Sequence, residues 1–530
     1  MQEVLVWSSV NLSYPSITLE ESVTSREMSL IHFVLILVLT VLVWRNGYLT
    51  KTLNNIISVP INAYLCWKNP VKSLNKSKNI PTCPFQLPNG QGNVKFAEGR
   101  AYSRRWASSF GEIYRIWAGT TPEVVLTRQE HMPAVFKDSH LHAKSFNFDA
   151  GWLFGELVGK AVGLLSGQDW NRVRDVFAPS FHRTKVDEFL PVIQRRVKQC
   201  LDELHASPKV HPNGALIISP ADDLRLLSFW VLCDIMYGDM TPEMEANMLK
   251  IVGEREQVWA NVTAGGALPP FHRTLLANCF ETDSQALPLA MACNRGRHEL
   301  KGTPPICTYY DAVEREELTE REMLDSMDEI LFANLDVTIG SLSWVLIFMA
   351  THPKVQDQLR EEIGSISKKS YAIRNEYISG SSSLLMACLL ESARLRPIAS
   401  FSGAQSPPTD REVGSYVIPA GMNVTVDIHG LNTDDPSWGD DRHQFNPRRF
   451  LDAKNHSVFR YRLWRFGFGP RQCLGKYLAD LFLKTLLAHI VENYRIEMKD
   501  SSPVSLDDLK GNSAGWINLA AEDVVWVRIS

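Results

Sequence analysis

The sequence lacks a dominant charge and lacks paired cysteine motifs. Its 530 residues carry 55 basic and 59 acidic side chains, for a formal net charge of −4, so no electrostatic footprint for a nucleic acid is expected. The nine cysteines are odd in number and scattered, with no CxxC pair and no Cys/His cluster. Neither a disulfide framework nor a zinc site is therefore predicted, and a reducing compartment is favoured. One cysteine can have a special role while the others serve as small core residues.

Internal repeats and long low-complexity linkers are also missing, and the chain has neither a Rossmann fingerprint nor an iron–sulfur cysteine run. What it does have is 45% hydrophobic and 22% charged residues, the profile of a globular protein with a large core. Its patterning is mostly helical. We predict one large, mainly α-helical domain with small β-sheets, preceded by an N-terminal anchor.

The anchor is the run MSLIHFVLILVLTVLVW at residues 28–44, which contains only three polar residues. It is slightly shorter than the ~20 residues that span a bilayer, and apolar residues shortly after it extend it. We predict a retained transmembrane helix over residues 28–48. A cleaved signal peptide is the alternative, but acidic residues precede the run and bulky Trp44 and Arg45 follow it, opposite to a signal-peptide pattern. A buried core helix is a further alternative.

Charge asymmetry predicts how this helix is oriented. No acidic residue occurs between Glu27 and Glu98. The basic residues that follow the run closely are Arg45, Lys51, Lys68, Lys72, Lys76 and Lys78. The positive-inside rule then places residues 1–27 in the lumen of the endoplasmic reticulum and the body in the cytosol. Asn11, in an Asn-Leu-Ser sequon, is a candidate glycosylation site in this lumenal tail. Prolines punctuate residues 49–88, predicted to be a stiff connector to a catalytic domain at residues 89–530.

The first part of the body contains a hairpin and a helix with an aromatic–cation pair. Two β-type runs, residues 113–117 and 123–126, are joined by Gly-Thr-Thr-Pro and predict the hairpin. The helix, within residues 166–181, places Trp170 and Arg174 four positions apart and therefore on one face. This pair is either a surface stack or part of a binding site.

The longest predicted helix runs from a Thr-Glu-Arg-Glu capping box to a His-Pro pair, over residues 319–352. About thirty residues of helix, at 1.5 Å per residue, span roughly 45 Å, which is enough to cross a domain. Asn334, Asp336 and Thr338 interrupt its apolar middle, where an unpaired polar group costs on the order of 1–3 kcal/mol. These side chains either satisfy one another structurally or line a cavity and handle protons or oxygen.

A later helix, within residues 382–397, carries Glu391 and Arg394 three positions apart among apolar residues. This is either an ordinary surface pair or a partly buried pair that needs a further partner. β-type runs follow at residues 415–428, and a loop then ends in FNPRRF. Arg449 of that motif is the candidate partner.

Near the C-terminal end, the loop FGFGPRQCLG at residues 466–475 leads into a predicted helix. Its three glycines and one proline predict a tight turn that holds Cys473 at the mouth of the helix. Taken alone, Cys473 is either an ordinary buried thiol or a thiolate stabilised by the helix N-terminus.

Together these elements resemble the cytochrome P450 superfamily. The loop matches the heme-binding loop of the family, whose fixed sites are filled by Phe466, Gly469, Arg471, Cys473 and Gly475. ESAR is similar to the E-x-x-R helix, with Glu391 and Arg394, and FNPRRF is similar to P-E-R-F, with Arg449 completing a structural triad. WNRVR is similar to the W-x-x-x-R helix, with Trp170 and Arg174. The elements occur in the order of the family, from about residue 80 to the C-terminus.

The resemblance implies the cytochrome P450 fold and the cofactor heme b (iron protoporphyrin IX). It implies Cys473 as the axial iron ligand, because a thiolate donates electron density that favours O–O cleavage. Glycines in the loop are expected to let the backbone approach sulfur and porphyrin closely. The residues implied to bind heme are Cys473, Phe466, Gly475, Arg471, Trp170 and Arg174.

The sequence departs from the family in the middle of the long helix. The family has an acidic residue followed directly by threonine, and here Asp336 is followed by Val337. Asp336 is expected to take part in proton delivery. Thr338, about 100° further round the helix, a water or a substrate hydroxyl would have to replace the threonine. Asn334 stands at the family's glycine position and would offer a polar group near oxygen. In FNPRRF, Arg448 replaces the glutamate of the family.

The implied function is that of a membrane-anchored heme-thiolate monooxygenase, similar to fungal P450s of secondary metabolism. It would use O₂ to hydroxylate, epoxidise or oxidatively couple a hydrophobic small molecule, with diketopiperazine or indole alkaloids and terpenoids as the expected substrate classes. Electrons would come from an NADPH–cytochrome P450 reductase on the same membrane. Substrate contacts are expected from residues 146–157, 398–402 and 514–517 and from the long helix.

Two alternatives have a different chemistry. One is a redox-neutral isomerase or dehydratase with this fold, which the displaced threonine makes worth considering and which would turn over without NADPH. The other is a non-catalytic heme- or lipid-binding membrane protein, against which the complete set of heme contacts argues.

Overall fold

The computed structural model describes residues 47–75, 78–87, 89–145, 152–206, 215–238, 240–263, 303–451, 456–499 and 524–528. It divides into two compact units, residues 1–65 and 66–530, which are treated separately. The predicted membrane run at residues 28–44, the sequon at Asn11 and the expected substrate contact at residues 514–517 lie outside the described residues.

The first described element is helix α2, Gly47–Lys68, which occupies much of the stretch predicted to be a stiff connector. The helix continues through Pro60, whose missing N–H removes one intrahelical hydrogen bond. Proline signals alone therefore did not reveal this helix. Ile56, Val59 and Tyr64 are exposed on it, each by more than half of the side chain's reference area (63%, 69% and 54%).

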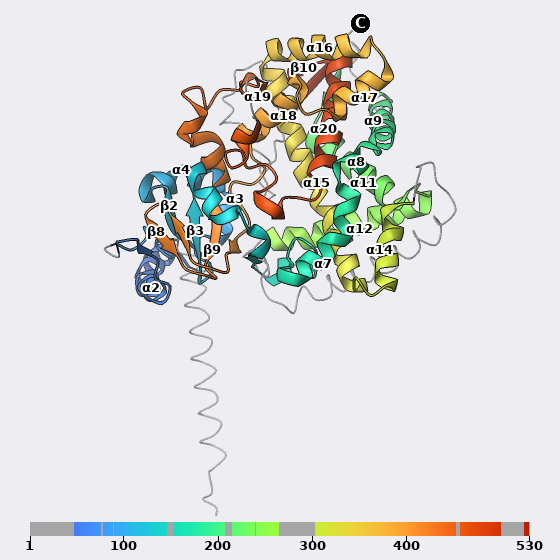
Figure 1. The fold of residues 1–530 in the computed structure, drawn as a ribbon. Coiled ribbons are helices and arrows are strands. Elements are labelled where there is room, and N and C mark those ends of the chain that lie inside the picture. Colours follow the sequence, from blue (N-terminus) through green and yellow to red (C-terminus); the bar gives the residue numbers. More distant parts are fainter. Residues whose placement is uncertain are drawn as a thin grey trace, which may run out of the picture. The chain divides into compact units, whose positions relative to one another are not determined.

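Helices make up most of the second unit, as predicted. They are α3 (Gly92–Ala97), α4 (Gly99–Phe110), α5 (Met132–Phe136), α6 (Trp152–Val158), α7 (Gly167–Phe177), α8 (Arg183–Asp187), α9 (Leu190–His205), α10 (Pro220–Asp223), α11 (Leu227–Tyr237), α12 (Pro242–Thr263), α14 (Pro305–Glu314), α15 (Glu320–Thr351), α16 (Pro353–Ser367), α17 (Tyr371–Ser379), α18 (Leu384–Leu395), α19 (Arg448–Leu451) and α20 (Lys476–Asn493). In Figure 1, α15 runs through the middle of this helical part, and it packs against α11, α18 and α20.

Helix α15 is the long helix that the sequence predicts. Thr319 caps it: its hydroxyl accepts a hydrogen bond from the Glu322 amide at 3.2 Å, and the Glu322 carboxylate accepts one from the Thr319 amide at 2.9 Å. The predicted capping box is confirmed. Within the described residues, α15 is the one helix long and apolar enough to cross a membrane, but 65% of its apolar stretch is buried inside the protein. That burial is what a core helix shows.

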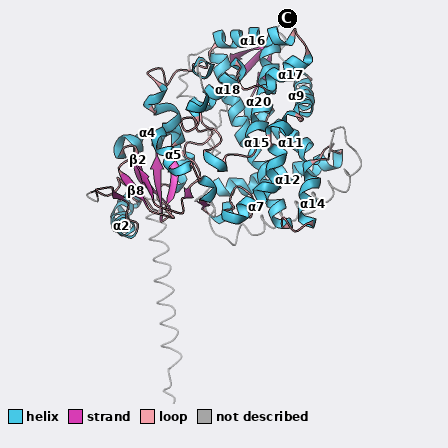
Figure 2. Ribbon diagram, viewed as in Figure 1, coloured by secondary structure: helices cyan, strands magenta, loops and turns pink. Residues whose placement is uncertain are grey.

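The larger β-sheet has five strands in the order β2-β3-β9-β6-β4. The strands are β2 (Ile113–Ala118), β3 (Thr121–Leu126), β9 (Asn423–Val426), β6 (Gln405–Ser406) and β4 (Ala143–Lys144). β2 and β3 form the predicted hairpin, with Ile113 opposite Leu126. β9 comes from the C-terminal half of the chain and pairs in parallel with β3, so the sheet joins distant segments. Figure 2 shows most of the strands gathered at one side of the helices.

Two three-stranded sheets complete the unit, in the orders β1-β8-β7 and β10-β11-β5. Their strands are β1 (Lys72–Ser73), β8 (Tyr416–Ile418), β7 (Arg411–Val413), β10 (Tyr494–Met498), β11 (Val524–Arg528) and β5 (Leu216–Ile218). The prediction of a mainly α-helical fold with small sheets is confirmed.

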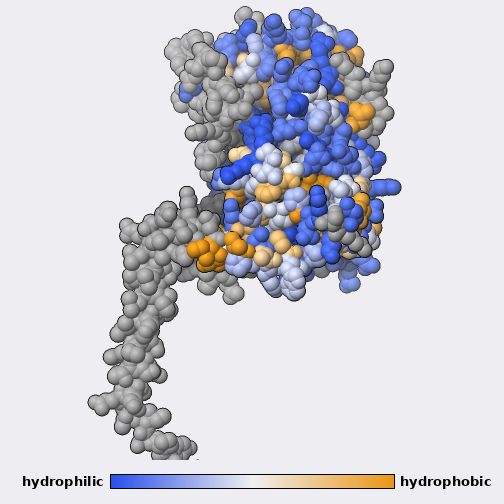
Figure 3. Space-filling model, turned by 90° about the vertical axis from the view of Figure 1, so that its left-hand side faces the viewer, coloured by the Kyte–Doolittle hydropathy of each residue, from blue (hydrophilic) through white to orange (hydrophobic). Residues whose placement is uncertain are grey.

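Burial separates a large helical core from a smaller core under the strands. The helical core contains Leu342, Phe348 and Leu486, none of them exposed. The smaller core includes Phe136 and Phe468 and therefore extends from the sheets to the loop at residues 466–475. Figure 3 shows a hydrophilic upper part on the face in view, with hydrophobic residues gathered lower down.

Candidate active site

The loop at residues 466–475, called the cysteine loop below, is held by aromatic packing and by one sterically demanding glycine. Phe468 is buried and its ring meets those of Phe136 and Trp464 edge-on, at centroid distances of 5.9 and 4.7 Å. Gly469 has φ +70°, and a Cβ there would stand 2.1 Å from the Phe136 carbonyl oxygen. Only glycine fits, because the loop lies directly against the end of α5.

Gly475 is not sterically restricted in the way that Gly469 is. Its φ is −76°, and a Cβ would meet only the Cys473 sulfur, at 3.9 Å, an ordinary contact. The described neighbours therefore give no steric reason for glycine at this position, and the close approach of this residue to the porphyrin stays a prediction. Its backbone N–H instead hydrogen-bonds to the Cys473 sulfur.

Cys473 stands three residues before the start of α20, with its amide donating to the Phe466 carbonyl at 2.9 Å. Its side chain is exposed, although the surrounding protein desolvates the thiol and raises its pKa. The Gly475 N–H and the charges of Arg174 and Lys476 act in the opposite direction and lower that pKa. The sulfur is accessible and can therefore act as a ligand. A metal ion bonded to it would stabilise the thiolate, which desolvation otherwise disfavours.

Two arginines lie close to the Trp170 ring beside the cysteine loop. The guanidinium of Arg471 stands 4.5 Å from the centre of the Trp170 rings, and that of Arg174 stands 5.1 Å away. Arg471 donates to the carbonyls of His142 and Leu165, and Arg174 donates to the Gln472 carbonyl at 3.0 Å. Helix α7 and the cysteine loop thus bring together the two positive charges that the sequence predicts at one site.

Two further charged residues belong to this cluster, and the sequence analysis did not find them. Burial and the charge of Arg471 lower the pKa of Lys144 to about 7, and Glu329 partly opposes that shift. Burial raises the pKa of Glu329, which accepts from the Gly163 amide at 2.9 Å. No motif marks Lys144. Glu329 had a signal, because it precedes Asp336 by seven residues and so lies on nearly the same face of α15.

This donor set fits heme. The uncovered Cys473 thiol provides the axial ligand that heme-thiolate chemistry needs. The guanidinium groups of Arg471 and Arg174 can donate charge-assisted hydrogen bonds to two propionates. Lys144 lies close to Arg471 and to the Glu329 carboxyl group. Burial and the neighbouring Arg174 lower the pKa of Arg471 to about 10, as expected for cations gathered without enough counter-charge.

Phe466, also expected beside the ligand, is half-buried in the structure. The guanidinium of Arg465 covers its ring at 4.6 Å. Its carbonyl accepts the Cys473 amide, so the described contribution of Phe466 to the ligand is a backbone hydrogen bond.

The middle of α15 shows where its polar side chains point. The Thr338 hydroxyl donates to the Asn334 side-chain oxygen, and the Asn334 amide donates to the Ser228 carbonyl of α11 at 2.9 Å. Thr338 is buried, whereas Ala333 is exposed and Val337 is half-buried. These contacts favour the structural interpretation of Asn334 and Thr338, a bridge between two helices. Asp336 is helical, and its side chain lies outside the described residues.

A threonine-to-valine change at position 338 distinguishes the two roles. Thr338→Val leaves the Asn334 oxygen without its donor, so we expect a loss of about 1–3 kcal/mol in unfolding free energy. The coupling of NADPH oxidation to product should not change, because the hydroxyl is directed at Asn334. Thr351→Val, at the end of the same helix, is the matched control, because the hydroxyl that it removes bonds only to groups of its own turn, the Ile347 and Phe348 carbonyls and the His352 ring. Stable Thr338→Val protein that diverts NADPH to hydrogen peroxide would assign this residue to oxygen chemistry instead.

Glu391, Arg394 and Arg449 form one buried ionic network. Arg394 donates to both Glu391 oxygens, at 2.7 and 2.8 Å, and Arg449 donates to one of them at 3.0 Å. The side chains of Glu391 and Arg394 are fully buried. Arg394 also donates to the carbonyls of Asn432 and Arg442, so it ties α18 to the loop that precedes Arg449.

The expected substrate-contact segments are described only in part. Residues 146–151 lie outside the described residues, and in α6 Leu153 and Leu157 are buried. In the turn at residues 398–402, Ser400 is buried while Ile398 is half-buried. The structure thus leaves Ile398 and Ala399 as the more accessible residues of that turn.

Comparison with known proteins identifies the family. Residues 91–515 match the family model for cytochrome P450. The chain is 38% identical over 468 residues to cytochrome P450 monooxygenase aclC of Aspergillus oryzae, covering 86% of this chain and 93% of the relative. It is 36% identical over 485 residues to cytochrome P450 monooxygenase gliC of Aspergillus fumigatus, covering 89% and 94%, and 35% identical over 516 residues to cytochrome P450 monooxygenase roqR of Penicillium rubens, covering 92% and 96%. The chain belongs to the cytochrome P450 family and is a heme-dependent monooxygenase oxidoreductase.

Proposed function

We propose that this protein inserts one oxygen atom of O₂ into a hydrophobic small molecule in a fungal secondary-metabolite pathway, with electrons from an NADPH–cytochrome P450 reductase. The observation that carries the proposal is the exposed Cys473 thiol three residues before α20, beside the guanidinium groups of Arg471 and Arg174. Similarity to fungal cytochrome P450 monooxygenases over most of the chain supports it.

The surroundings of Cys473, Arg471 and Arg174 indicate what each residue does in binding heme. When bound through a thiolate, heme supplies O₂ activation at its iron. Cys473 holds the iron, and the Gly475 N–H and the positive end of α20 stabilise the negative sulfur. Arg471 and Arg174, which both lie against the Trp170 ring, would bind the propionates and fix the orientation of the group.

The heme-binding residues themselves supply neither the electrons nor the protons for the reaction. The chain has no nicotinamide-binding or iron–sulfur motif, so a separate reductase is the electron donor in this proposal. Asp336 follows Glu329 on nearly the same face of α15, and we assign proton delivery to Asp336. With Thr338 bonded to Asn334, a water or a substrate hydroxyl takes the place of the family threonine.

The proposal places the enzyme on the endoplasmic reticulum membrane, spanned once by residues 28–48 with the catalytic domain in the cytosol. The charge asymmetry around that run supports it. The exposed apolar residues of α2, which follows directly, suit a lipid–water interface. Glycosylation of Asn11 would show that residues 1–27 are lumenal.

Product formation in microsomes tests the function. Membranes containing this protein and a reductase are supplied with NADPH and with extracts of the host lacking its gene, and products are identified by mass spectrometry under ¹⁸O₂. Diketopiperazine or indole alkaloids and terpenoids are the classes to examine first. We expect a product that gains ¹⁸O, or two hydrogens fewer after coupling, only with NADPH. Turnover without NADPH would support a redox-neutral enzyme, and a heme protein with no turnover would support the binding role.

Heme retention measures the role of Arg174. Removing one charge-assisted hydrogen-bond donor costs about 1.5–3 kcal/mol, so Arg174→Ala should lose heme to an acceptor apoprotein roughly 10- to 100-fold faster. Arg172→Ala is the matched control, since it removes the same charge from the same helix, where Arg172 binds Glu322 at 2.7 Å instead. Equal rates of heme loss in the two variants would contradict the assignment.

A further inference from the structure

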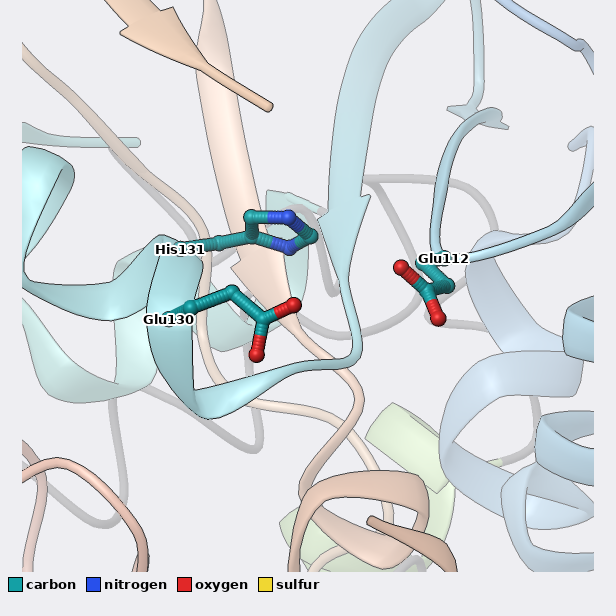
Figure 4. A group of neighbouring side chains, drawn as sticks. All are labelled: Glu112, Glu130 and His131. Carbon is teal, nitrogen blue, oxygen red and sulfur yellow. The ribbon is translucent and has the colours of Figure 1, made fainter. Parts of the chain in front are cut away.

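Outside the heme site, a histidine and two glutamates converge near the start of the five-stranded sheet. Glu112 lies between α4 and β2, and Glu130 and His131 lie in the 3-10 turn η1, Gln129–His131. One potential ligand atom from each residue lies within 4.8 Å of the other two. In Figure 4, Glu130 lies beneath the His131 ring and Glu112 faces the same space from across it.

His131 adds an observation that the acidic residues alone do not provide. The residue is 7% exposed, and its Nδ1 is buried with no hydrogen-bond partner among the residues that the structure describes. Figure 4 shows one ring nitrogen directed toward the glutamate side. Buried polar atoms are almost always paired, so an unpaired one aimed at two carboxylates indicates a group that binds between them.

The packing around the ring keeps His131 in this orientation. Gly414, in the turn between β7 and β8, has φ +55°, and a Cβ there would stand 3.3 Å from the His131 Nε2. The same Cβ would stand 2.7 Å from the Ile113 side chain. The β7–β8 turn therefore closes one side of the imidazole and leaves Nδ1 facing the carboxylates.

We propose that Glu112, Glu130 and His131 form a binding site for a divalent transition-metal ion of the Zn²⁺ class. One imidazole nitrogen and two carboxylate oxygens are ligands that such ions accept, with water at the fourth position. The site uses no cysteine, which is why cysteine spacing in the sequence gave no sign of it.

The geometry allows the ligands to close around an ion. Bonds of about 2.0–2.1 Å place tetrahedral ligand atoms roughly 3.4 Å apart. Because the three ligand atoms lie within 4.8 Å of one another, the carboxylates must approach by up to about 1.4 Å. Glu112 and Glu130 are exposed and free to do so, whereas His131 stays in place. Arg128 occupies one Glu112 oxygen at 3.0 Å and leaves the other available.

Neighbouring charges affect how strongly the site would bind a cation. Arg128 weakens cation binding, while Asp435 adds a negative charge next to η1, where it accepts from the Gln129 amide at 3.1 Å. An ion here would join the β2 end of the sheet to η1. Because η1 leads directly into α5, whose Phe136 contacts the cysteine loop, the bound ion would also stiffen the support of that loop.

Zinc content of the purified holoenzyme tests the site. Full-length protein in detergent is stripped with a chelator, dialysed against buffered Zn²⁺, and analysed for zinc per heme by mass spectrometry. Glu130→Gln and Glu112→Gln change exposed side chains and should fold. His443→Gln is the matched control. His443 lies 3.7 Å from one carboxylate, that of Asp434, and does not belong to the proposed metal site.

We expect a zinc equivalent in the wild type and in His443→Gln whose affinity falls at least tenfold in Glu130→Gln and in Glu112→Gln. The thermal midpoint of the wild type should rise with Zn²⁺, and that rise should be lost in the two glutamine variants. Failure of the wild type to retain zinc, or equal affinity in the wild type and both glutamine variants, would overturn the proposal. Neither result bears on oxygenation.

Discussion

Replacing Cys473 with serine is expected to abolish NADPH-dependent oxygenation without unfolding the protein. The side chain is exposed and packs in no core, so the change removes little burial. A serine hydroxyl stays protonated and cannot donate electron density to iron as a thiolate does. We expect turnover to fall by at least about 100-fold, as for the loss of other preorganised electrostatic groups. The reduced carbon monoxide complex should also lose the absorption band typical of thiolate-ligated heme.

Cys200→Ser is the control for this experiment. Cys200 lies in α9, is partly buried against the helical core, and has its pKa raised to about 11 by burial, so it is an inert thiol. The same substitution there should leave both turnover and the spectrum unchanged. Full turnover in Cys473→Ser would exclude the thiolate mechanism.

Replacing Arg394 with alanine is expected to cause the largest loss of stability among single changes at the described ion pairs. Glu391 and Arg394 are fully buried, and removing one partner leaves a buried charge that Arg449 alone must balance. Breaking a buried pair in this way typically costs 3–5 kcal/mol, a large part of the roughly 5–15 kcal/mol of a folded domain. The carbonyls of Asn432 and Arg442 lose their donor as well.

The denaturant midpoint, followed by far-ultraviolet circular dichroism and by heme absorbance, measures this loss. Arg225→Ala is the matched control, since Arg225 pairs with Glu256 at 2.6 Å but both side chains are more than a third exposed. Its loss should cost less than about 1 kcal/mol. Equal midpoints for Arg394→Ala and Arg225→Ala would show that the buried network does not stabilise the fold.

Elements whose signals are local were predicted well. The capping box, the ends of α15 and the β2–β3 hairpin depend on residues within a few positions of one another, and the structure confirms them. The structure of the connector at residues 49–88 was harder to predict. Helix α2 continues through Pro60, because one proline removes one hydrogen bond and the flanking residues still favour a helix.

Features that depend on contacts between distant segments were beyond the sequence. Asn334 donates to the Ser228 carbonyl of a helix about a hundred residues earlier, a partner that no local pattern predicts, and its expected place near oxygen stays a prediction. Lys144 joins the cation cluster only because β4 pairs with β6 in the five-stranded sheet. The spacing of residues along the chain does not predict that β4 pairs with β6.

By itself, the sequence determined the chemistry that this chain can offer. A cysteine in a glycine-rich turn before a helix, two arginines with a tryptophan, and the Glu391–Arg394 spacing are local patterns, because each depends on residues that share a turn or a helix face. The tertiary structure decided which groups meet. It connected Asn334 to α11, placed Glu329 and Lys144 beside Arg471, and directed His131 at two glutamates. Packing of distant elements sets those directions, since each buried polar group must find a partner wherever the fold supplies one.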